Sequence, residues 1–293
     1  MNDLKTSLPW GKRTFVMGII NVTPDSFSGD GLLQNLRTVD AAIHKAELYL
    51  QEGADLIDIG GESTRPGAAL VDPDQELARV MPVIEGILKV FPDTCLSIDT
   101  YKAEVAKQAL QAGACWVNDV WGFRADPHLA QVVADFKAPV VLMHNRLKPG
   151  SAELQERLGG HYVGVEYHDL IGEICQELME SVEIAHHSGV TDGQIILDPG
   201  IGFGKTIAQN LALLDRLDEI KALGYPLLVG PSRKSFIGYT LDLPPEERVE
   251  GTAAAVAVSI VRGADVIRVH DVKQMARVAR MTDAIVRRAQ ANS

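Results

Sequence analysis

Eight short runs of β-forming residues recur along the chain, and each run ends on a polar or charged residue that precedes a helix-like stretch. Burying such a side chain without a partner costs roughly 1–3 kcal/mol. A strand whose only role is to form a core would therefore not end on a polar residue. Eight parallel strands whose polar tips meet at one mouth describe the active face of a (β/α)8 barrel. The eight tips are Asn21, Glu62, Asp99, Asn118, His144, Asp198, Lys234 and His270.

The predicted strands are nearly continuous apolar runs, which is typical of parallel strands buried on both faces. Gly53, Gly113 and Gly263 each stand where a left-handed residue would end a helix just before a strand, so one kind of βα unit repeats. An open, doubly wound sheet would also alternate strands and helices, but eight polar tips favour closure. We expect strands at 15–21, 56–61, 95–100, 116–120, 140–144, 195–198, 226–230 and 266–270.

Length and charge limit the domain organisation and the partners. The chain has 293 residues, which suits one barrel of about 250 residues with modest extensions. We therefore expect a lead-in at 1–14 and a single α/β barrel domain at 15–290. A net charge of −11 argues against a nucleic-acid partner. No apolar run reaches the ~20 residues of a membrane helix, and no signal peptide is recognisable, so we expect a cytoplasmic protein that does not bind membranes.

The three cysteines are Cys95, Cys115 and Cys175, an odd number without metal-binding spacing. Cytosolic proteins rarely keep disulfides, because the surrounding thiol pool is reducing. We therefore expect all three cysteines to be reduced and to behave as small buried hydrophobic residues.

Two long loops are expected, at 22–35 and at 145–160. The first carries Asp25 and Asp30 among glycines, so it can fold over a substrate and help to hold Mg²⁺, which prefers oxygen ligands. A turn capped by these Asp side chains is an equally good interpretation. The second loop contains Gly, Lys, Pro and Ser residues that predict a mobile surface segment.

Asp99, Asn118 and Asp198 stand at three of the expected strand tips and could bind one ligand together. Carboxylates accept hydrogen bonds, and an amide both donates and accepts, so the set suits the N–H and NH₂ edge of an aminopyrimidinone ring. A single Asp at a strand end more often caps a helix, and Asp99 could cap one that starts at Thr100. Three such residues in one mouth favour the ligand site.

Four cationic or titratable residues lie on or after the last two expected strands. Arg233 and Lys234 follow the seventh strand, and Arg268 and His270 lie on the eighth. Residues two apart on a strand point to the same side, so Arg268 and His270 share one face. A buried Arg needs an acid or an anion, and loops after these strands often bind phosphate in this architecture. A lone histidine would be a satisfied core residue, but beside Arg268 we assign His270 to a phosphate site.

Glycine-rich segments flank the expected mouth. Arg65 follows two glycines and offers a planar donor fork for a carboxylate or phosphate, although a solvated arginine in a turn is the alternative. Residues 198–206 look like a phosphate loop, but Pro199 occupies a position where the Walker pattern needs glycine. We interpret this segment as a loop beside the site, with Phe203 available to pack on a flat ring.

Five motifs in order along the chain resemble the dihydropteroate synthase family: NVTPDSFS at 21–28, DIGGESTRPG at 58–67, DPGIGFGK at 198–205, SRKSFIG at 232–238 and RVHDV at 268–272. The resemblance implies a TIM barrel that joins 6-hydroxymethyl-7,8-dihydropterin pyrophosphate to 4-aminobenzoate with Mg²⁺. The products would be 7,8-dihydropteroate, for folate synthesis, and pyrophosphate. Sulfonamides compete with the aminobenzoate in this family.

The resemblance also implies residue roles. Asn21 would bind Mg²⁺, and Lys234 would join the three oxygen-bearing residues around the pterin. Thr64, Arg268 and His270 would lie near the pyrophosphate. The catalytic residues would be Asp99, Lys234, Arg268 and His270, and the aminobenzoate site would be lined by Phe27, Arg65, Pro66 and Ser235. The chain departs from the family pattern in the order Gly29-Asp30-Gly31 and in the run 144–146.

The chemistry predicts a dissociative displacement. The aniline nitrogen is a weak nucleophile, so catalysis should lie in departure of pyrophosphate, helped by Mg²⁺, Arg268 and His270. Asp99 and Asp198 would stabilise a cation-like pterin, and closure of the loops would exclude water.

Other functions fit part of the pattern. A methyltetrahydrofolate-dependent methyltransferase shares the barrel and a similar pterin pocket, but it needs no pyrophosphate cradle. A non-catalytic pterin-binding paralogue would not need intact loops after the first and second strands. The segments 247–261 and 272–289 could form a homodimer face, although the second also suits a last barrel helix.

Overall fold

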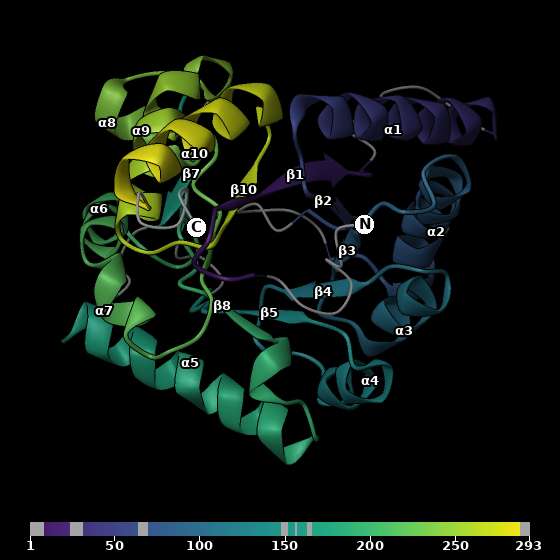
Figure 1. Cartoon of the computed structure of the whole chain (residues 1–293), viewed down its shortest axis with the longest axis horizontal. Helices are drawn as coiled ribbons and strands as arrows, with labels where there is room; N and C mark the ends of the chain where they lie inside the picture. The colour runs from purple at the N-terminus through teal and green to yellow at the C-terminus, as the bar shows by residue number, and fades with distance from the viewer. Residues whose placement is uncertain are drawn as a thin grey trace.

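Eight parallel strands form one sheet that curls around a central axis, and helices surround it (Figure 1). The computed structural model describes residues 9–23, 32–63, 70–147, 152–155, 157–162 and 166–287. The barrel strands are β1 (Phe15–Asn21), β2 (Leu56–Gly60), β3 (Leu96–Asp99), β4 (Trp116–Asp119), β5 (Val140–Met143), β8 (Ile195–Asp198), β9 (Leu228–Val229) and β10 (Val266–Val269).

The strand order is β8-β5-β4-β3-β2-β1-β10-β9, so each predicted strand pairs with its neighbour in sequence. The ring closes between its first and last strands, because Leu197 forms a parallel bridge with Leu227 and its N–H donates to the Pro226 carbonyl at 2.9 Å. The predicted barrel is therefore confirmed, and the open-sheet alternative is wrong.

Helices cover the outside of the sheet (Figure 1). Gly53, Gly113 and Gly263 have φ angles of 100°, 109° and 104°, which confirms the predicted left-handed turns before three strands. The helices are α1 (Leu32–Glu52), α2 (Pro73–Val90), α3 (Ala103–Gln111), α4 (Leu129–Phe136), α5 (Leu170–His187), α6 (Ile207–Asp215), α7 (Leu217–Lys221), α8 (Ser235–Leu241), α9 (Val249–Val261) and α10 (Val272–Val286), with short 3₁₀ turns at Asp192–Gln194 and Pro245–Glu247.

Part of the expected loop at 145–160 has regular structure. β6 (Ala152–Gln155) and β7 (Gly159–Tyr162) form an antiparallel hairpin. Between the strands, the Leu158 carbonyl accepts a 3.0 Å hydrogen bond from the buried guanidinium of Arg248. The prediction of a loop throughout 145–160 was wrong for this hairpin, because the long-range anchor to Arg248 leaves no local sequence signal.

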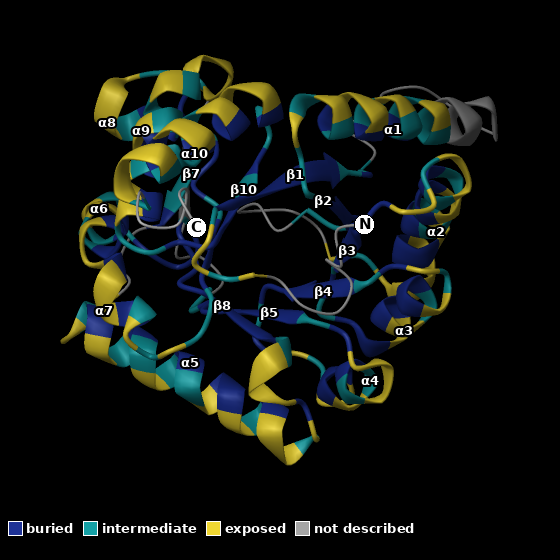
Figure 2. Cartoon of the chain, in the orientation of Figure 1, coloured by how far each residue is buried: buried dark blue, intermediate teal, exposed yellow. Residues whose placement is uncertain are grey.

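Apolar side chains fill two layers. The larger layer lies between the strands and the helices, and the buried strands contrast with exposed outer helix faces in Figure 2. The smaller layer includes Phe15, Met17, Trp116 and Val266, with Cys95 among its buried members. Apolar side chains therefore cover both faces of the parallel strands, which explains the continuous apolar runs. Within the described part of the chain, no helix is long and apolar enough to span a bilayer.

Two cysteines contradict the expectation of reduced thiols. Cys95 and Cys115 precede the neighbouring strands β3 and β4, and they pair as a disulfide with Cα atoms 6.1 Å apart. Cys175 is free and half-buried. The expectation of reduced thiols rested on the odd number of cysteines and on an expected cytosolic location. Neither indicates that the residues preceding two neighbouring strands lie side by side.

Candidate functional site

Arg268 joins two carboxylates at the barrel mouth. Its Nε donates to Asp58 Oδ2 at 2.6 Å, and its Nη2 donates to Asp99 Oδ2 at 2.6 Å. Asn118 Nδ2 also donates to Asp58 Oδ2, at 3.0 Å. Arg268 and Asp99, both predicted to lie at the mouth, are therefore in direct contact. A buried arginine was expected to need an acid or an anion, and Arg268 has two acids as partners.

Asp58 is the residue that sequence reasoning missed in this network. It is fully buried within β2, and its Oδ1 has no partner among the described residues. The available signal was a carboxylate inside the otherwise apolar run of β2. A buried charge is stable only when it is paired, so that signal predicted a cation nearby.

Asp99 ends β3 and faces the mouth. The first helix after it starts at Ala103 and is preceded by Lys102, so the alternative of Asp99 as a helix cap is wrong. Burial raises the pKa of the Asp99 carboxyl to about 7; the Arg268 charge opposes this shift and Asp58 adds to it. At neutral pH, Asp99 can therefore hold or release a proton.

Asp198 and Lys234 lie at the same mouth, on the other side of the barrel. Asp198 ends β8, and its Oδ1 accepts from the Gly200 N–H at 2.7 Å. Burial raises the pKa of the Asp198 carboxyl to about 6. The charge of Lys234 opposes that rise, as it does at Asp99. The Lys234 ammonium lies 4.0 Å from the centre of the Phe203 ring. Lys234 therefore acts on carboxylates from two separate strands.

His270 follows β10 and is neutral at physiological pH. Its Nδ1 lies 3.1 Å from Ser232 Oγ, and its backbone carbonyl accepts from the Tyr49 hydroxyl at 2.9 Å. Burial lowers its pKa to about 3, and the charges of Arg268 and Arg233 act in the same direction. The imidazole therefore serves as a hydrogen-bonding group rather than as a cation.

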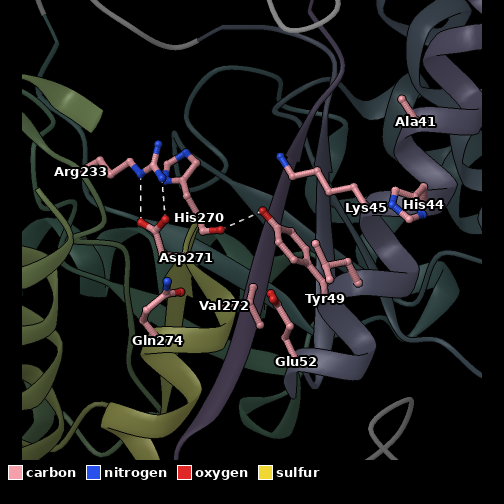
Figure 3. A pocket seen from close by; sticks show the side chains of 11 residues that line it. Ala41, His44, Lys45, Tyr49, Glu52, Arg233, His270, Asp271, Val272 and Gln274 are labelled. Atoms are coloured by element: carbon pink, nitrogen blue, oxygen red, sulfur yellow. Dashed lines mark hydrogen bonds and ion pairs between the residues drawn. The ribbon is translucent and has the colours of Figure 1, made fainter. Parts of the chain in front are cut away.

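A pocket of about 460 Å³ opens beside His270, between α1 and the start of α10 (Figure 3). Arg233 lines it, but its guanidinium is turned to Asp271, with Nε donating to Oδ2 at 2.9 Å. Lys45 and Tyr49 of α1 form the facing wall. Arg233, which we grouped with Lys234, thus points to a different cavity.

Lys205 is a buried cation that braces the Gly-rich loop. Its Nζ lies 3.0 Å from the Gly200 carbonyl, 3.1 Å from the Phe203 carbonyl and 3.0 Å from His144 Nδ1. His144 Nε2 in turn lies 3.1 Å from Glu177 Oε2. Burial lowers the pKa of Lys205 to about 7. With its three donors occupied, this lysine is not a phosphate ligand, which agrees with our rejection of a Walker loop.

A second buried cation lies beside the end of β2. Lys102 Nζ pairs with the carboxylates of Glu62 and Glu76, and all three side chains are at most 9% exposed. From α2, Arg79 Nη1 donates to the Gly61 carbonyl at 2.7 Å. Glu62, one of the predicted strand tips, is therefore paired with a buried lysine.

The remaining predicted residues are placed as follows. Asn21 ends β1 and is partly exposed, and Ser235 is the first residue of α8. Four predicted residues lie outside the described residues: Phe27, Thr64, Arg65 and Pro66. Among the residues that are described, no group of three His, Cys, Asp or Glu side chains could hold a metal ion.

Comparison with known proteins agrees with this geometry. A family described as pterin binding enzyme matches residues 17–270. Dihydropteroate synthase of Bacillus subtilis is 50% identical over 281 residues, which cover 96% of this chain and 92% of the relative. The chain belongs to the dihydropteroate synthase family.

Solved members of the family share the fold. The Clostridium difficile enzyme, crystallised in the presence of pteroic acid, is 48% identical with a TM-score of 0.85, and the match covers 96% of this chain and 99% of that one. The Xanthomonas albilineans enzyme with 4-aminobenzoic acid is 42% identical with a TM-score of 0.82, over 93% of each chain. The expected transferase function, dihydropteroate synthesis for folate, is confirmed, and the methyltransferase and non-catalytic alternatives are not retained.

Proposed function

We propose that the barrel mouth seats the pterin ring on Asp99, Asn118 and Asp198, with Lys234 between the two carboxylates. One observation carries this proposal: Arg268 donates at 2.6 Å to both Asp58 and Asp99, so a cation and its acids share one buried network at the strand tips. Ionised carboxylates accept from ring N–H groups, and a neutral carboxyl donates to a ring nitrogen or carbonyl.

The reaction is a dissociative substitution at the exocyclic carbon of the pterin. The carbon–oxygen bond to the diphosphate breaks first, and its electron pair leaves with pyrophosphate. The amine of 4-aminobenzoate then forms the new carbon–nitrogen bond and loses a proton. Asp99 and Asp198 stabilise the positive charge that the ring carries between the two steps, because buried carboxylates interact strongly with charge that develops close to them.

The leaving diphosphate belongs on the side of Arg268 and His270. Arg268 supplies the permanent charge, and the imidazole of His270 supplies a hydrogen-bonding nitrogen. An arriving anion would raise the depressed pKa of His270, since burial and neighbouring cations are what lower it. Protonation of His270 would then neutralise part of the charge on pyrophosphate. Thr64, which lies outside the described residues, stays a predicted contact.

Mg²⁺ fits this mouth only with ligands from the substrate. Asn21 offers one amide oxygen at the end of β1, and the described residues supply no ready-made cluster of carboxylates. Mg²⁺ commonly keeps several waters and completes its octahedron with substrate phosphates. When bound, the ion would neutralise charge on the diphosphate.

The 4-aminobenzoate belongs beside the pterin at the barrel mouth. The Xanthomonas albilineans relative binds 4-aminobenzoic acid and, in another structure, 7,8-dihydropteroate. Ser235 at the start of α8 lies next to Lys234 in the chain, which supports a place at this end of the mouth. Phe203 is the described aromatic residue beside Lys234. The contacts predicted for Phe27, Arg65 and Pro66 remain predictions.

A homodimer through α9 and α10 is also proposed. The two helices pack against each other, and their exposed large apolar side chains are Val258, Val261, Met281, Ile285 and Val286. Apolar side chains gathered on one surface are typical of interfaces. A cytoplasmic location stays a prediction.

The site is tested by steady-state turnover of Asp99→Asn, Asp198→Asn and Lys234→Ala. We expect each change to lower kcat/KM for the pterin substrate by at least about 100-fold, since each removes a charge beside the reacting ring. Asp93→Asn, an exposed residue between α2 and β3, makes the same chemical change as a control and should leave turnover intact. Wild-type turnover in all three site variants would contradict the assignment.

A further inference from the structure

Within the described part of the chain, the pocket beside His270 contains one cation without a counter-ion. Lys45 is half-buried on α1, and its ammonium lies 5.4 Å from the centre of the Tyr49 ring. Among the described residues, no carboxylate is within ion-pair distance of it. Burial lowers the pKa of Lys45, and the Arg233 charge acts in the same direction. An uncompensated ammonium in such a place favours an anion.

A second donor faces the same space. Arg233 uses Nε and Nη2 for Asp271, which leaves Nη1 without an acceptor in the described part of the chain. Its backbone adopts the left-handed region, with φ at 57°, and its N–H donates to Thr252 Oγ1 at 3.1 Å. Arg233 is therefore held at its backbone by Thr252 and at its guanidinium by Asp271. In Figure 3, the Lys45 ammonium points across the pocket toward His270 and Arg233.

The negative groups of the pocket are Asp271 and Glu52. Asp271 is occupied by both donors of Arg233. Glu52 lies at the other end of the pocket, beside Val272 (Figure 3). The part between Lys45, Arg233 and His270 is therefore the region best suited to a small, highly charged anion.

We propose that this pocket is a second binding site for inorganic pyrophosphate, which receives the product after it leaves the reacting carbon. The inference rests on the proposed function, because His270 is the group that the mouth and the pocket share. Pyrophosphate would pass from Arg268 to Lys45 and the free Nη1 of Arg233 without crossing the pterin. Lys45 is a product-binding residue that no motif of the sequence indicated.

The test is titration of inorganic pyrophosphate into the full-length protein by calorimetry, together with product inhibition of turnover. In Lys45→Met, which keeps the apolar stem of the side chain, we expect pyrophosphate to bind about tenfold more weakly, as for loss of one charge-assisted contact at a half-exposed site. The inhibition constant for pyrophosphate should rise by the same factor, while the KM values for both substrates stay within about twofold of wild type.

Two variants control this test. Lys107→Met removes the same charge from an exposed position on α3 and should leave pyrophosphate binding unchanged. Lys45→Arg restores the charge and should restore binding, which separates lost charge from misfolding. Unchanged pyrophosphate affinity in Lys45→Met would overturn the inference, as would a parallel rise in KM for the pterin substrate. Failure of the proposed function would appear instead as wild-type turnover in the Asp99, Asp198 and Lys234 variants.

Discussion

Replacing Arg268 by Met tests how the mouth balances its charges. The guanidinium is 18% exposed, and the two carboxylates it holds, Asp58 and Asp99, are 0% and 13% exposed. Breaking a buried ion pair by removing one partner costs about 3–5 kcal/mol. Because Asp99 can take up a proton in the variant, we expect the lower end, about 3 kcal/mol of unfolding free energy at pH 7.

The cost should increase with pH. The folded pKa of Asp99 is raised to about 7, and Arg268 opposes that rise, so the pKa goes higher still without it. An unfolded Asp has a pKa near 3.9 and is ionised throughout this range. Above pH 7, the folded variant keeps a proton that the folded wild type and both unfolded chains have lost. The variant therefore loses up to about 1.4 kcal/mol per pH unit relative to wild type until its own pKa is reached.

The assay is urea unfolding of the ligand-free protein from pH 6 to pH 9. Arg262→Met is the matched control, because Arg262 also lies near two carboxylates, at 2.7 Å from Asp215 and 3.5 Å from Asp218, but on the surface. That change should cost within about 1 kcal/mol at every pH. Equal costs for the two variants, or a cost at Arg268 that is flat with pH, would refute the reasoning.

Three further predictions concern the supporting structure. Lys102→Met leaves Glu62 and Glu76 together without their cation, so urea unfolding should show a loss of about 3 kcal/mol or more, partly recovered by adding Glu76→Gln; no recovery would exclude charge as the cause. Lys205→Met leaves buried acceptors unpaired and should cost about 2–4 kcal/mol by the same assay, and a neutral result would mean that water replaces the ammonium. Alkylation of the denatured, unreduced protein should label Cys175 alone, and labelling of all three cysteines would show that the disulfide is absent.

The barrel was predictable because its signals are local. A continuous apolar run such as β5 reports burial on both faces, and a glycine such as Gly113 reports the left-handed turn between a helix and a strand. The polar tips were equally visible, since each lies at the end of its own run. Parallel strands bring their carboxyl ends to one edge, which is why Asp99 and Asp198 could be assigned to one mouth.

The partners of those tips were not predictable, because they depend on contacts between distant segments. His144 and Glu62 look like site residues at their strand ends, yet the first contacts Lys205 and the second Lys102. Asp58 and Arg268 are 210 positions apart in sequence. The local sequence around Asp58 or Arg268 does not indicate that these two residues form an ion pair.

The central claim is that the mouth releases pyrophosphate before the amine attacks, and the most direct measurement is rapid-quench detection of pyrophosphate from the pterin substrate with no 4-aminobenzoate present. We expect pyrophosphate to appear with wild-type protein, together with a trapped pterin, and to appear at least about 100-fold more slowly with Asp99→Asn. If no pyrophosphate forms on any timescale until 4-aminobenzoate is added, the displacement is concerted and the account is contradicted.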